Sequence, residues 1–285
     1  MSHSHISSRA VEAATRLAQR LRIPCRDPII LHESLHISIR LFPLDVVARA
    51  VSIGDQEATN RLTREICIAR HLARNDAPVV GPSTEVPGGP HIQEGFAFTL
   101  WKFVEHVAAD DDNAEHVGRA AEALRRVHQQ LDGFAGELPD FWTKIDHCRR
   151  LLDTETALPA LGATERALLQ TAFDRLRALV ASLPANAVPI HGDAHLGNVF
   201  ITRDGALWND LEDVCLGPRE WDIVWLPVAD LSAFEPINRD LLSALRYLRS
   251  LCVSVWCWEK YDRPEKREAA EYHLRYLRES GLFER

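Results

Sequence analysis

The sequence lacks both a long uninterrupted apolar run and a leader of basic and then apolar residues. Its most apolar late segment, 241–258, contains Arg246 and Arg249 and so fits an amphipathic buried helix better than a membrane span. The N-terminus, Met-Ser-His-Ser-His, does not have the pattern of a signal peptide. These absences predict a soluble, cytoplasmic protein with no membrane partner.

The chain also lacks a cysteine pattern and an excess of basic charge. Its six cysteines are scattered without a C-x-x-C pair, which is typical of reduced thiols and indicates neither a disulfide framework nor a cysteine metal site. Lys and Arg number 33 against 41 Asp and Glu, a formal net charge of −8. Such a chain is a poor candidate for gripping nucleic acid, so we expect no nucleic acid partner, whereas a cationic small substrate is compatible.

Apolar residues make up 46% of the 285 positions, enough to bury one large core or two modest ones. Strand patterns occupy 35–41, 46–51 and 96–104. Helical patterns predict the following helices: 8–22, 56–74, 114–131, 141–152, 164–183, 237–261 and 264–280. The predicted fold class is α+β, with a small strand-rich N-terminal part over 1–104 and a larger helical part over 105–285.

The densest group of potentially reactive residues runs from His191 to Asp210. His191, Asp193 and Asn198 have the spacing H-x-D-x-x-x-x-N of a kinase catalytic loop, and Asp210 follows 12 residues after Asn198. An Asp-Gly pair between two β-like stretches predicts a hairpin turn. This hairpin is expected to bring Asp193, Asn198 and Asp210 together at one end.

Phosphoryl transfer needs these residue types. One carboxylate must orient the attacking hydroxyl and accept its proton, and separate oxygen ligands must hold Mg²⁺ against the triphosphate. Carboxylate and amide oxygens suit Mg²⁺. Taken by residue type alone, His191, Asp193 and His195 also fit a metal site for hydrolysis, although no further histidine cluster with matching spacing completes it.

The run His191-Gly192-Asp193-Ala194-His195-Leu196-Gly197-Asn198 is followed by Asn209-Asp210-Leu211-Glu212-Asp213, Gly217-Pro218 and Trp221-Asp222. This pattern resembles the aminoglycoside phosphotransferase family, which includes choline, homoserine, macrolide and sugar kinases. The resemblance is strongest over 188–226. It implies a protein-kinase-like fold of two lobes, a small antiparallel-sheet N-lobe ending in a hinge near Val104 and a larger helical C-lobe.

The resemblance also implies roles for the motif residues. Asp193 would be the catalytic base, and Asn198 and Asp210 would be the magnesium ligands. His191 would brace the loop, and Asp222 would hold it through hydrogen bonds. His195 matches a histidine of the family motif, but the sequence assigns it no role.

The N-terminal half carries the residues that the resemblance assigns to the nucleotide. Arg49 lies on the second strand, where kinases usually have a lysine that pairs the α- and β-phosphates, and a guanidinium can bind phosphate bidentately. Glu65, on the following helix, is its expected ion-pair partner, although an ordinary surface pair is the alternative. Trp101 would stand at the entrance of the hinge strand, although simple core filling is the alternative. The backbone of Lys102 and Val104 would meet the adenine.

The chain departs from the family pattern in the loop that covers the phosphates. The first glycine is Gly54, so the segment 32–36 contains none, although glycine eases the approach of backbone to phosphate. Ser34 offers a hydroxyl and an amide instead. This departure favours a second hypothesis, a nucleotide-binding pseudokinase without turnover, against which the complete set of Asp193, Asn198 and Asp210 argues.

We therefore predict an enzyme that uses Mg²⁺ and ATP, or GTP, to phosphorylate a hydroxyl of a small molecule of aminoglycoside, amino alcohol or sugar type. The sequence does not identify the acceptor or the oligomeric state. Glu212, Asp213 and Glu220 lie near the predicted acceptor side and could attract an amine, but a solvated acidic loop is an equal explanation.

Overall fold

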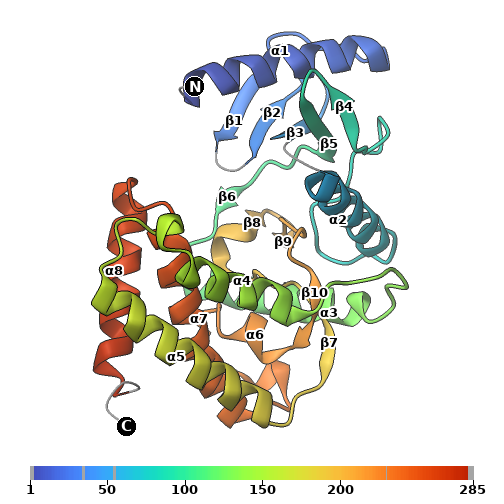
Figure 1. Cartoon of the computed structure of the whole chain (residues 1–285). Helices are drawn as coiled ribbons and strands as arrows, with labels where there is room; N and C mark the ends of the chain where they lie inside the picture. The colour runs from blue at the N-terminus through green and yellow to red at the C-terminus, as the bar shows by residue number, and fades with distance from the viewer. Residues whose placement is uncertain (1–2, 34–35, 54–55, 229, 282–285) are drawn as a thin grey trace. The chain divides into compact units, whose positions relative to one another are not determined.

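The computed structural model describes residues 3–33, 36–53, 56–228 and 230–281 (Figure 1). The chain forms two compact units, each built from two separate segments. The first unit contains Met1–Ala135 and His195–Asp213, and the second contains Gly136–Ala194 and Val214–Arg285. The chain therefore passes from the second unit to the first within the predicted catalytic loop, and back again after Asp213.

The first unit is built on a five-stranded antiparallel sheet with the order β1-β2-β3-β5-β4. Its strands are β1 (Ile29–Glu33), β2 (Ile37–Arg40), β3 (Val46–Ser52), β4 (His91–Gln93) and β5 (Phe96–Lys102). In the central pair, Arg49 of β3 lies opposite Thr99 of β5. This register places Arg49 in the middle of the sheet rather than at an edge.

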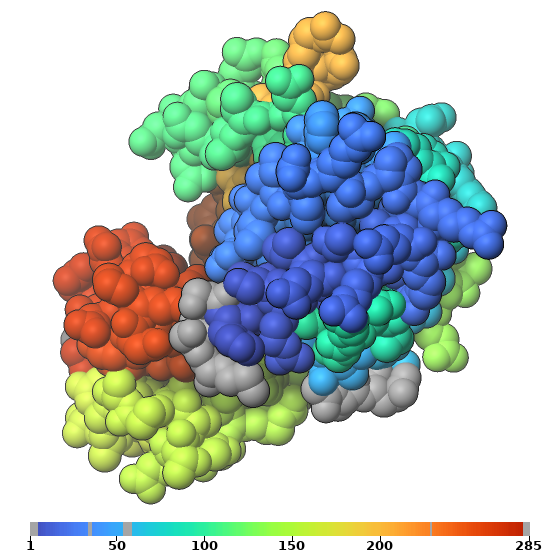
Figure 2. Space-filling model, turned by 90° about the horizontal axis from the view of Figure 1, so that it is seen from above, coloured from blue at the N-terminus to red at the C-terminus, as the bar shows by residue number. Residues whose placement is uncertain are grey.

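Helix α1 (His3–Leu21) covers the sheet with its apolar stripe. Ala10, Ala14 and Leu17 recur at helical spacing, and all three are fully buried against a core that includes Ile39 and Phe98. The dark blue atoms of α1 lie against the brighter blue atoms of the following strands in Figure 2. The small alanine side chains allow the helix to approach the sheet closely.

Two more helices and a second sheet complete this unit. Helix α2 (Gln56–Arg74) contacts β5, and α3 (Ala114–Leu131) begins at Asn113, whose side chain accepts the backbone N–H groups of Glu115 and His116. The second sheet has three short antiparallel strands: β6 (Val107–Ala108), β8 (Val199–Thr202) and β9 (Gly205–Trp208). The buried Trp208 fixes β9 on α3, because its indole N–H donates to the Ala120 carbonyl at 3.1 Å.

The second unit is mainly helical. Its helices are α4 (Phe141–Asp153), α5 (Ala163–Ser182), α6 (Glu220–Ile223), α7 (Arg239–Trp258) and α8 (Pro264–Glu279). Helix α7 contacts each of the other four and buries the leucines at 241, 245, 248 and 251, so it is the core of the unit. Strands β7 (Ala187–Ile190) and β10 (Cys215–Pro218) form an antiparallel pair that leads into the catalytic loop.

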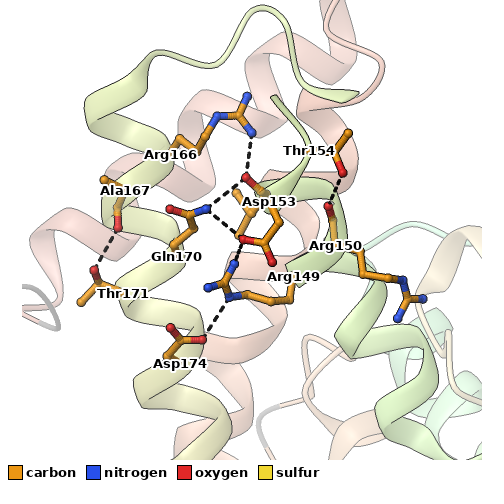
Figure 3. Close-up of polar contacts among 10 residues, drawn as sticks. Arg149, Arg150, Asp153, Thr154, Arg166, Ala167, Gln170, Thr171 and Asp174 are labelled. Carbon is orange, nitrogen blue, oxygen red and sulfur yellow. Dashed lines mark hydrogen bonds and ion pairs between the residues drawn. The ribbon is translucent and has the colours of Figure 1, made fainter. Parts of the chain in front are cut away.

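A polar network joins α4 to α5 (Figure 3). Arg149 of α4 binds Asp153 one turn further along and reaches Asp174 of α5 at 3.1 Å. From α5, Gln170 donates to Asp153 at 3.1 Å, and Arg166 donates at 2.9 Å to a backbone carbonyl near the end of α4. Each exposed ion pair of this kind contributes little to stability. The main effect of the network is therefore to set the orientation of α4 against α5.

The predicted α+β fold class is confirmed, with an antiparallel sheet in the N-terminal region and helices in the C-terminal region. The expected helices at 56–74 and 114–131 begin and end where predicted. The strand expected at 35–41 is β2, although its first residue, Leu35, lies outside the described residues. Within the described part of the chain, no helix combines the length and apolar composition that a membrane span requires.

Candidate active site

The first half of the motif is held by hydrogen bonds to its backbone. Asp222, fully buried, accepts the N–H of His191 at 2.7 Å and the N–H of Gly192 at 2.8 Å with its two carboxylate oxygens. Trp221 donates its indole N–H to the Gly192 carbonyl at 2.9 Å. Gly192 has φ +82°, a conformation that other residues rarely adopt. The expected holding contact of Asp222 is therefore present.

His191 is fully buried, and its Nδ1 accepts the backbone N–H of Asp193 at 3.4 Å. This contact matches the expected bracing position and places the imidazole under the loop rather than beside a substrate. Asp193 itself remains partly exposed, and the ammonium group of Lys144 on α4 lies 3.8 Å from its Oδ1. Sequence reasoning did not find Lys144, because no motif marks it.

The second half of the motif lies in the first unit, at the open end of the β8–β9 hairpin. His195 begins the short 3₁₀ turn Leu196–Asn198, and its Nδ1 accepts the Gly197 N–H at 3.1 Å, so it caps this turn. The Asn209 N–H donates to the Asn198 carbonyl at 2.9 Å, which closes the hairpin next to Asp210. The backbone of Asn198 therefore lies beside that of Asn209, the residue before Asp210.

Asp193 belongs to the other unit and is joined to Asn198 by a five-residue stretch of chain. Such a stretch spans at most about 18 Å.

The alternative metal site would use His191 and His195. The Nδ1 atom of His191 accepts the backbone N–H of Asp193, and the Nδ1 atom of His195 accepts that of Gly197. Those two nitrogens therefore stabilise the loop and are not offered to a metal ion.

Arg49 is the centre of a charge cluster in the first unit. Its guanidinium lies 2.7 Å from Glu65 Oε1, 2.8 Å from Asp210 Oδ1 and 3.6 Å from Glu212 Oε2. The expected ion pair with Glu65 is therefore present, and Glu65 is fully buried. Three carboxylates share one cation, and Asp210 has φ +61°, a conformation that costs energy for a residue other than glycine.

Burial and mutual attraction shift the pKa values of this cluster in different directions. Burial alone would lower the pKa of the Arg49 guanidinium, but its attraction to Glu65, Asp210 and Glu212 outweighs burial and raises that pKa. Burial raises the pKa of Glu65 to about 7, against the opposing effect of Arg49. The second carboxylate oxygen of Glu65 has no hydrogen-bond partner among the described residues, which agrees with this direction.

Glu212 is also engaged within the cluster. Burial raises the pKa of its carboxyl, but the hydrogen bond and charge of His36, with the charges of Arg49 and Arg61, outweigh burial and lower the pKa to about 2. His36 Nε2 lies 3.3 Å from Glu212 Oε2. His36, Asp210 and Glu212 each offer a potential metal-ligand atom within 4.8 Å of the others, but Arg49 already supplies positive charge to both acids.

The motif that contains these residues is part of a longer match. Residues 45–264 match the Phosphotransferase enzyme family (APH). The chain belongs to this family. The match includes Arg49, Glu65, Asp193, Asn198 and Asp210, so the resemblance found in the motif is confirmed for most of the chain.

Solved structures with the same fold extend over nearly the whole chain. The GDP and kanamycin complex of APH(2")-IIia is 17% identical with a TM-score of 0.71, and the alignment covers 94% of this chain and 98% of that one. Amicoumacin kinase hAmiN with AMP-PNP, Ca²⁺ and Ami is 13% identical with a TM-score of 0.70 and coverage of 98% and 96%. A choline/ethanolamine kinase family protein from Mesorhizobium loti is 17% identical with a TM-score of 0.61 and coverage of 96% and 95%. No curated protein sequence matches significantly.

The predicted hinge lies at the end of β5 in this member of the phosphotransferase family. Trp101 is almost fully buried and donates its indole N–H to Thr99 Oγ1 at 2.8 Å, so it packs in the unit rather than standing at an entrance. The Lys102 N–H donates to the Gly81 carbonyl at 3.1 Å. The Val104 N–H has no hydrogen-bond partner among the described residues, so it is the better placed of the two amides to meet a base.

The first unit also contains a groove of about 1410 Å³. Lys102 and Val104 line it, together with parts of α3 and the β8–β9 hairpin, but Arg49, Glu65 and Asp210 do not. Of the loop expected to cover the phosphates, Ser34 lies outside the described residues. His36 from the same loop does contact Glu212.

Proposed function

We propose that this chain is a magnesium-dependent kinase that transfers the γ-phosphoryl group of ATP to a hydroxyl group of a small molecule in the cytoplasm. The observation that carries the proposal is the arrangement in the first unit. Arg49 contacts both Glu65 and Asp210 there, and Asp210 lies beside Asn198 at the open end of one hairpin. Phosphoryl transfer needs such a combination of a fixed cation and oxygen ligands.

Asn198 and Asp210 fit the metal that this reaction requires. Their amide and carboxylate oxygens are the donors that Mg²⁺ prefers. Bound Mg²⁺ would neutralise charge on the phosphates. Arg49 would exchange its contact with Asp210 for phosphate oxygens and keep its buried partner Glu65, because a guanidinium can serve both at once through its fork of N–H donors.

Asp193 would act as the base. As the acceptor oxygen forms its bond to the γ-phosphorus and the β–γ bridging bond breaks to release ADP, the proton of the hydroxyl passes to the Asp193 carboxylate. The hydrogen bonds from the His191 and Gly192 N–H groups to Asp222 support this role because they fix the backbone directly before the reacting group. The hinge would join the lobes 1–104 and 105–285. There, beside Trp101, the Val104 N–H and the Lys102 backbone would meet the adenine.

Solved structures with this fold support the class of reaction. One is a complex with GDP and kanamycin and another contains AMP-PNP with Ca²⁺, so nucleotides and a divalent cation occur in proteins of similar fold. Aminoglycoside, amino alcohol and sugar acceptors are therefore the first to test. The glycine-free segment 32–36 is the observation that favours the alternative, a pseudokinase that binds nucleotide without turnover.

The deciding experiment measures transfer of the labelled γ-phosphoryl group of ATP, with and without Mg²⁺, to a panel of these acceptors. We expect Asp193→Asn to lower kcat roughly 100- to 10,000-fold while the Mg²⁺-dependent thermal shift caused by ATP is kept. Asp204→Asn, a change of the same chemistry at an exposed position on the hairpin turn, is the matched control. Near-normal turnover by Asp193→Asn would refute the assignment, and a nucleotide shift without transfer to any acceptor would favour the pseudokinase.

A further inference from the structure

Two side chains from different helices of the second unit meet beside Asp193. Lys144 of α4 has its ammonium 3.8 Å from Asp193 Oδ1 and 5.0 Å from the centroid of the Trp256 ring of α7. The 3.8 Å separation is longer than a hydrogen bond, so charge attraction, rather than a shared proton, holds the pair. The Trp256 ring is partly exposed and attracts the ammonium through its face.

The packing of α4 on α7 brings Lys144 and Trp256 close together. Cys148, one turn beyond Lys144, and Cys252, one turn before Trp256, are both fully buried, and burial followed by the neighbouring Cys252 raises the pKa of the Cys148 thiol. The contact between α4 and α7 therefore brings Lys144 and Trp256 to the same end of the helix pair. The opposite side of α4 is held on α5 by the network of Arg149 and Asp153 (Figure 3).

Two of the three acids that were expected to attract an amine, Glu212 and Glu220, are used elsewhere. Glu212 contacts His36 and Arg49 in the first unit. Glu220 accepts the backbone N–H of Asn238 at 3.0 Å and so holds the start of α7. One acid does lie near Lys144. The charges of Lys144 and of the exposed Glu259 both affect the pKa of the Cys148 thiol. The charge closest to the predicted base on this face is thus positive.

Resting on the proposed function, we propose that the acceptor carries an anionic group, such as a carboxylate, near its reacting hydroxyl. Lys144 binds that group while Asp193 receives the hydroxyl proton, and the Trp256 ring contacts the carbon skeleton between them. Without Lys144, an anionic acceptor would be repelled by the negative charge of Asp193. With it, a cationic group in the same place is repelled, which disfavours polyamine acceptors.

The test uses two sets of acceptors that keep the hydroxyl and change only the charge. One set is glycerate, glycerol and 3-amino-1,2-propanediol, and the other is 4-(hydroxymethyl)benzoate, its primary amide and 4-(hydroxymethyl)benzylamine. We measure kcat and KM for transfer from ATP, after subtracting acceptor-independent hydrolysis. The wild type is expected to favour the carboxylate over the amine about 10- to 100-fold in kcat/KM in at least one set, the usual effect of one charge-assisted contact.

Variants separate a charge effect from a general loss of structure. Lys144→Met is expected to remove the preference by raising KM for the carboxylate, because the contact contributes to binding rather than to the chemical step. Lys144→Glu is expected to reverse the preference. Lys266→Met, on α8, is the control for loss of one positive charge from the same unit.

The outcomes are distinguishable. A wild type that prefers the amine or neutral members, or a preference unchanged in Lys144→Met, overturns the acceptor assignment while Asp193-dependent transfer leaves the proposed function in place. Transfer to none of the six acceptors also overturns the assignment, and the Mg²⁺-dependent shift with ATP then reports on the proposed function separately.

Discussion

The two halves of the catalytic motif are stabilised by different physics. In the second unit, Asp222 uses both carboxylate oxygens on backbone N–H groups and so fixes the loop before Asp193. In the first unit, Asp210 shares Arg49 with Glu65 and Glu212. Hydrogen bonds to backbone permit one geometry, whereas a cation shared by three acids can exchange one partner for a phosphate. We therefore expect the loop before the proposed base, Asp193, to be rigid, and the Arg49 cluster proposed to meet the phosphates and the metal to be adjustable.

The largest effect is expected from removing the shared cation. Arg49→Met leaves Glu65 buried without its partner, beside two further carboxylates, so we expect a loss of about 3–5 kcal/mol in the free energy of unfolding. Urea unfolding followed by tryptophan fluorescence measures it. Arg16→Met, at an exposed pair with Glu94, should change stability by less than about 0.5 kcal/mol. A similar small loss for Arg49→Met would show that the cluster is not held by charge.

The pH dependence of the first unit provides the second test. Burial raises the pKa of Glu65 from 4.5 to about 7, so the folded protein binds this proton more tightly than the unfolded chain does. The free energy of unfolding should therefore fall as pH rises from about 4.5 to 7, by on the order of 3 kcal/mol. Glu65→Gln should abolish this part of the fall, because glutamine resembles the protonated acid.

The measurement is urea unfolding of both proteins between pH 5 and pH 7.5, with Glu94→Gln as the exposed control. Burial lowers the pKa of His273 to about 4, which gives a slope of opposite sign. That slope is present in all three proteins and cancels in their differences. Parallel curves for wild type and Glu65→Gln would contradict the raised pKa of Glu65.

A smaller loss of stability is expected in the loop before Asp193. Asp222→Asn keeps one oxygen but turns an amide N–H₂ toward a backbone N–H that needs an acceptor, so we expect a loss of about 1–3 kcal/mol. Urea unfolding measures this loss. Asp174→Asn, at an exposed end of the α4–α5 network, is the control. A loss for Asp222→Asn as small as that of the control would show that Asp222 does not hold the loop.

The smallest effect should come from the network that orients α4. Arg149→Met removes contacts to Asp153 and Asp174 at exposed positions, so thermal unfolding should show a loss of about 1 kcal/mol or less. A lower rate of phosphoryl transfer with an almost unchanged free energy of unfolding would show that the network positions Lys144, because α4 carries that residue. A loss above about 2 kcal/mol would show that surface ion pairs contribute substantially to the stability of the second unit.

Much of the fold could be predicted because its long helices carry periodic apolar residues. Helices α2 and α3 were predicted to the residue, and α4 and α5 to within one residue at the ends. The short strands β1, β4 and β6 were not predicted. β1 is largely exposed and β4 and β6 have three and two residues, so no alternation of buried side chains marks them.

For the site, the sequence predicted the residues of the motif but not all their surroundings. Asp222 and His191 lie where the motif suggested, and the cap formed by His195 could have been inferred from its position before a short turn. The sequence left open whether Trp101 stands at the hinge entrance or fills the core, because an aromatic residue in a strand looks the same in both places, and the structure buries it.

The sequence by itself determined the motif and the helices and strands that carry it, because both are written in local spacing. Only the tertiary structure decided which side chains surround the carboxylates of Asp193 and Asp210. Arg49 and Asp210 are 161 residues apart, and Lys144 of α4 lies 3.8 Å from Asp193, which follows β7. Contacts between distant segments leave no periodic signal, since they depend on how whole elements pack. The charge beside each acid, and with it the proposed choice of acceptor, belongs to the fold.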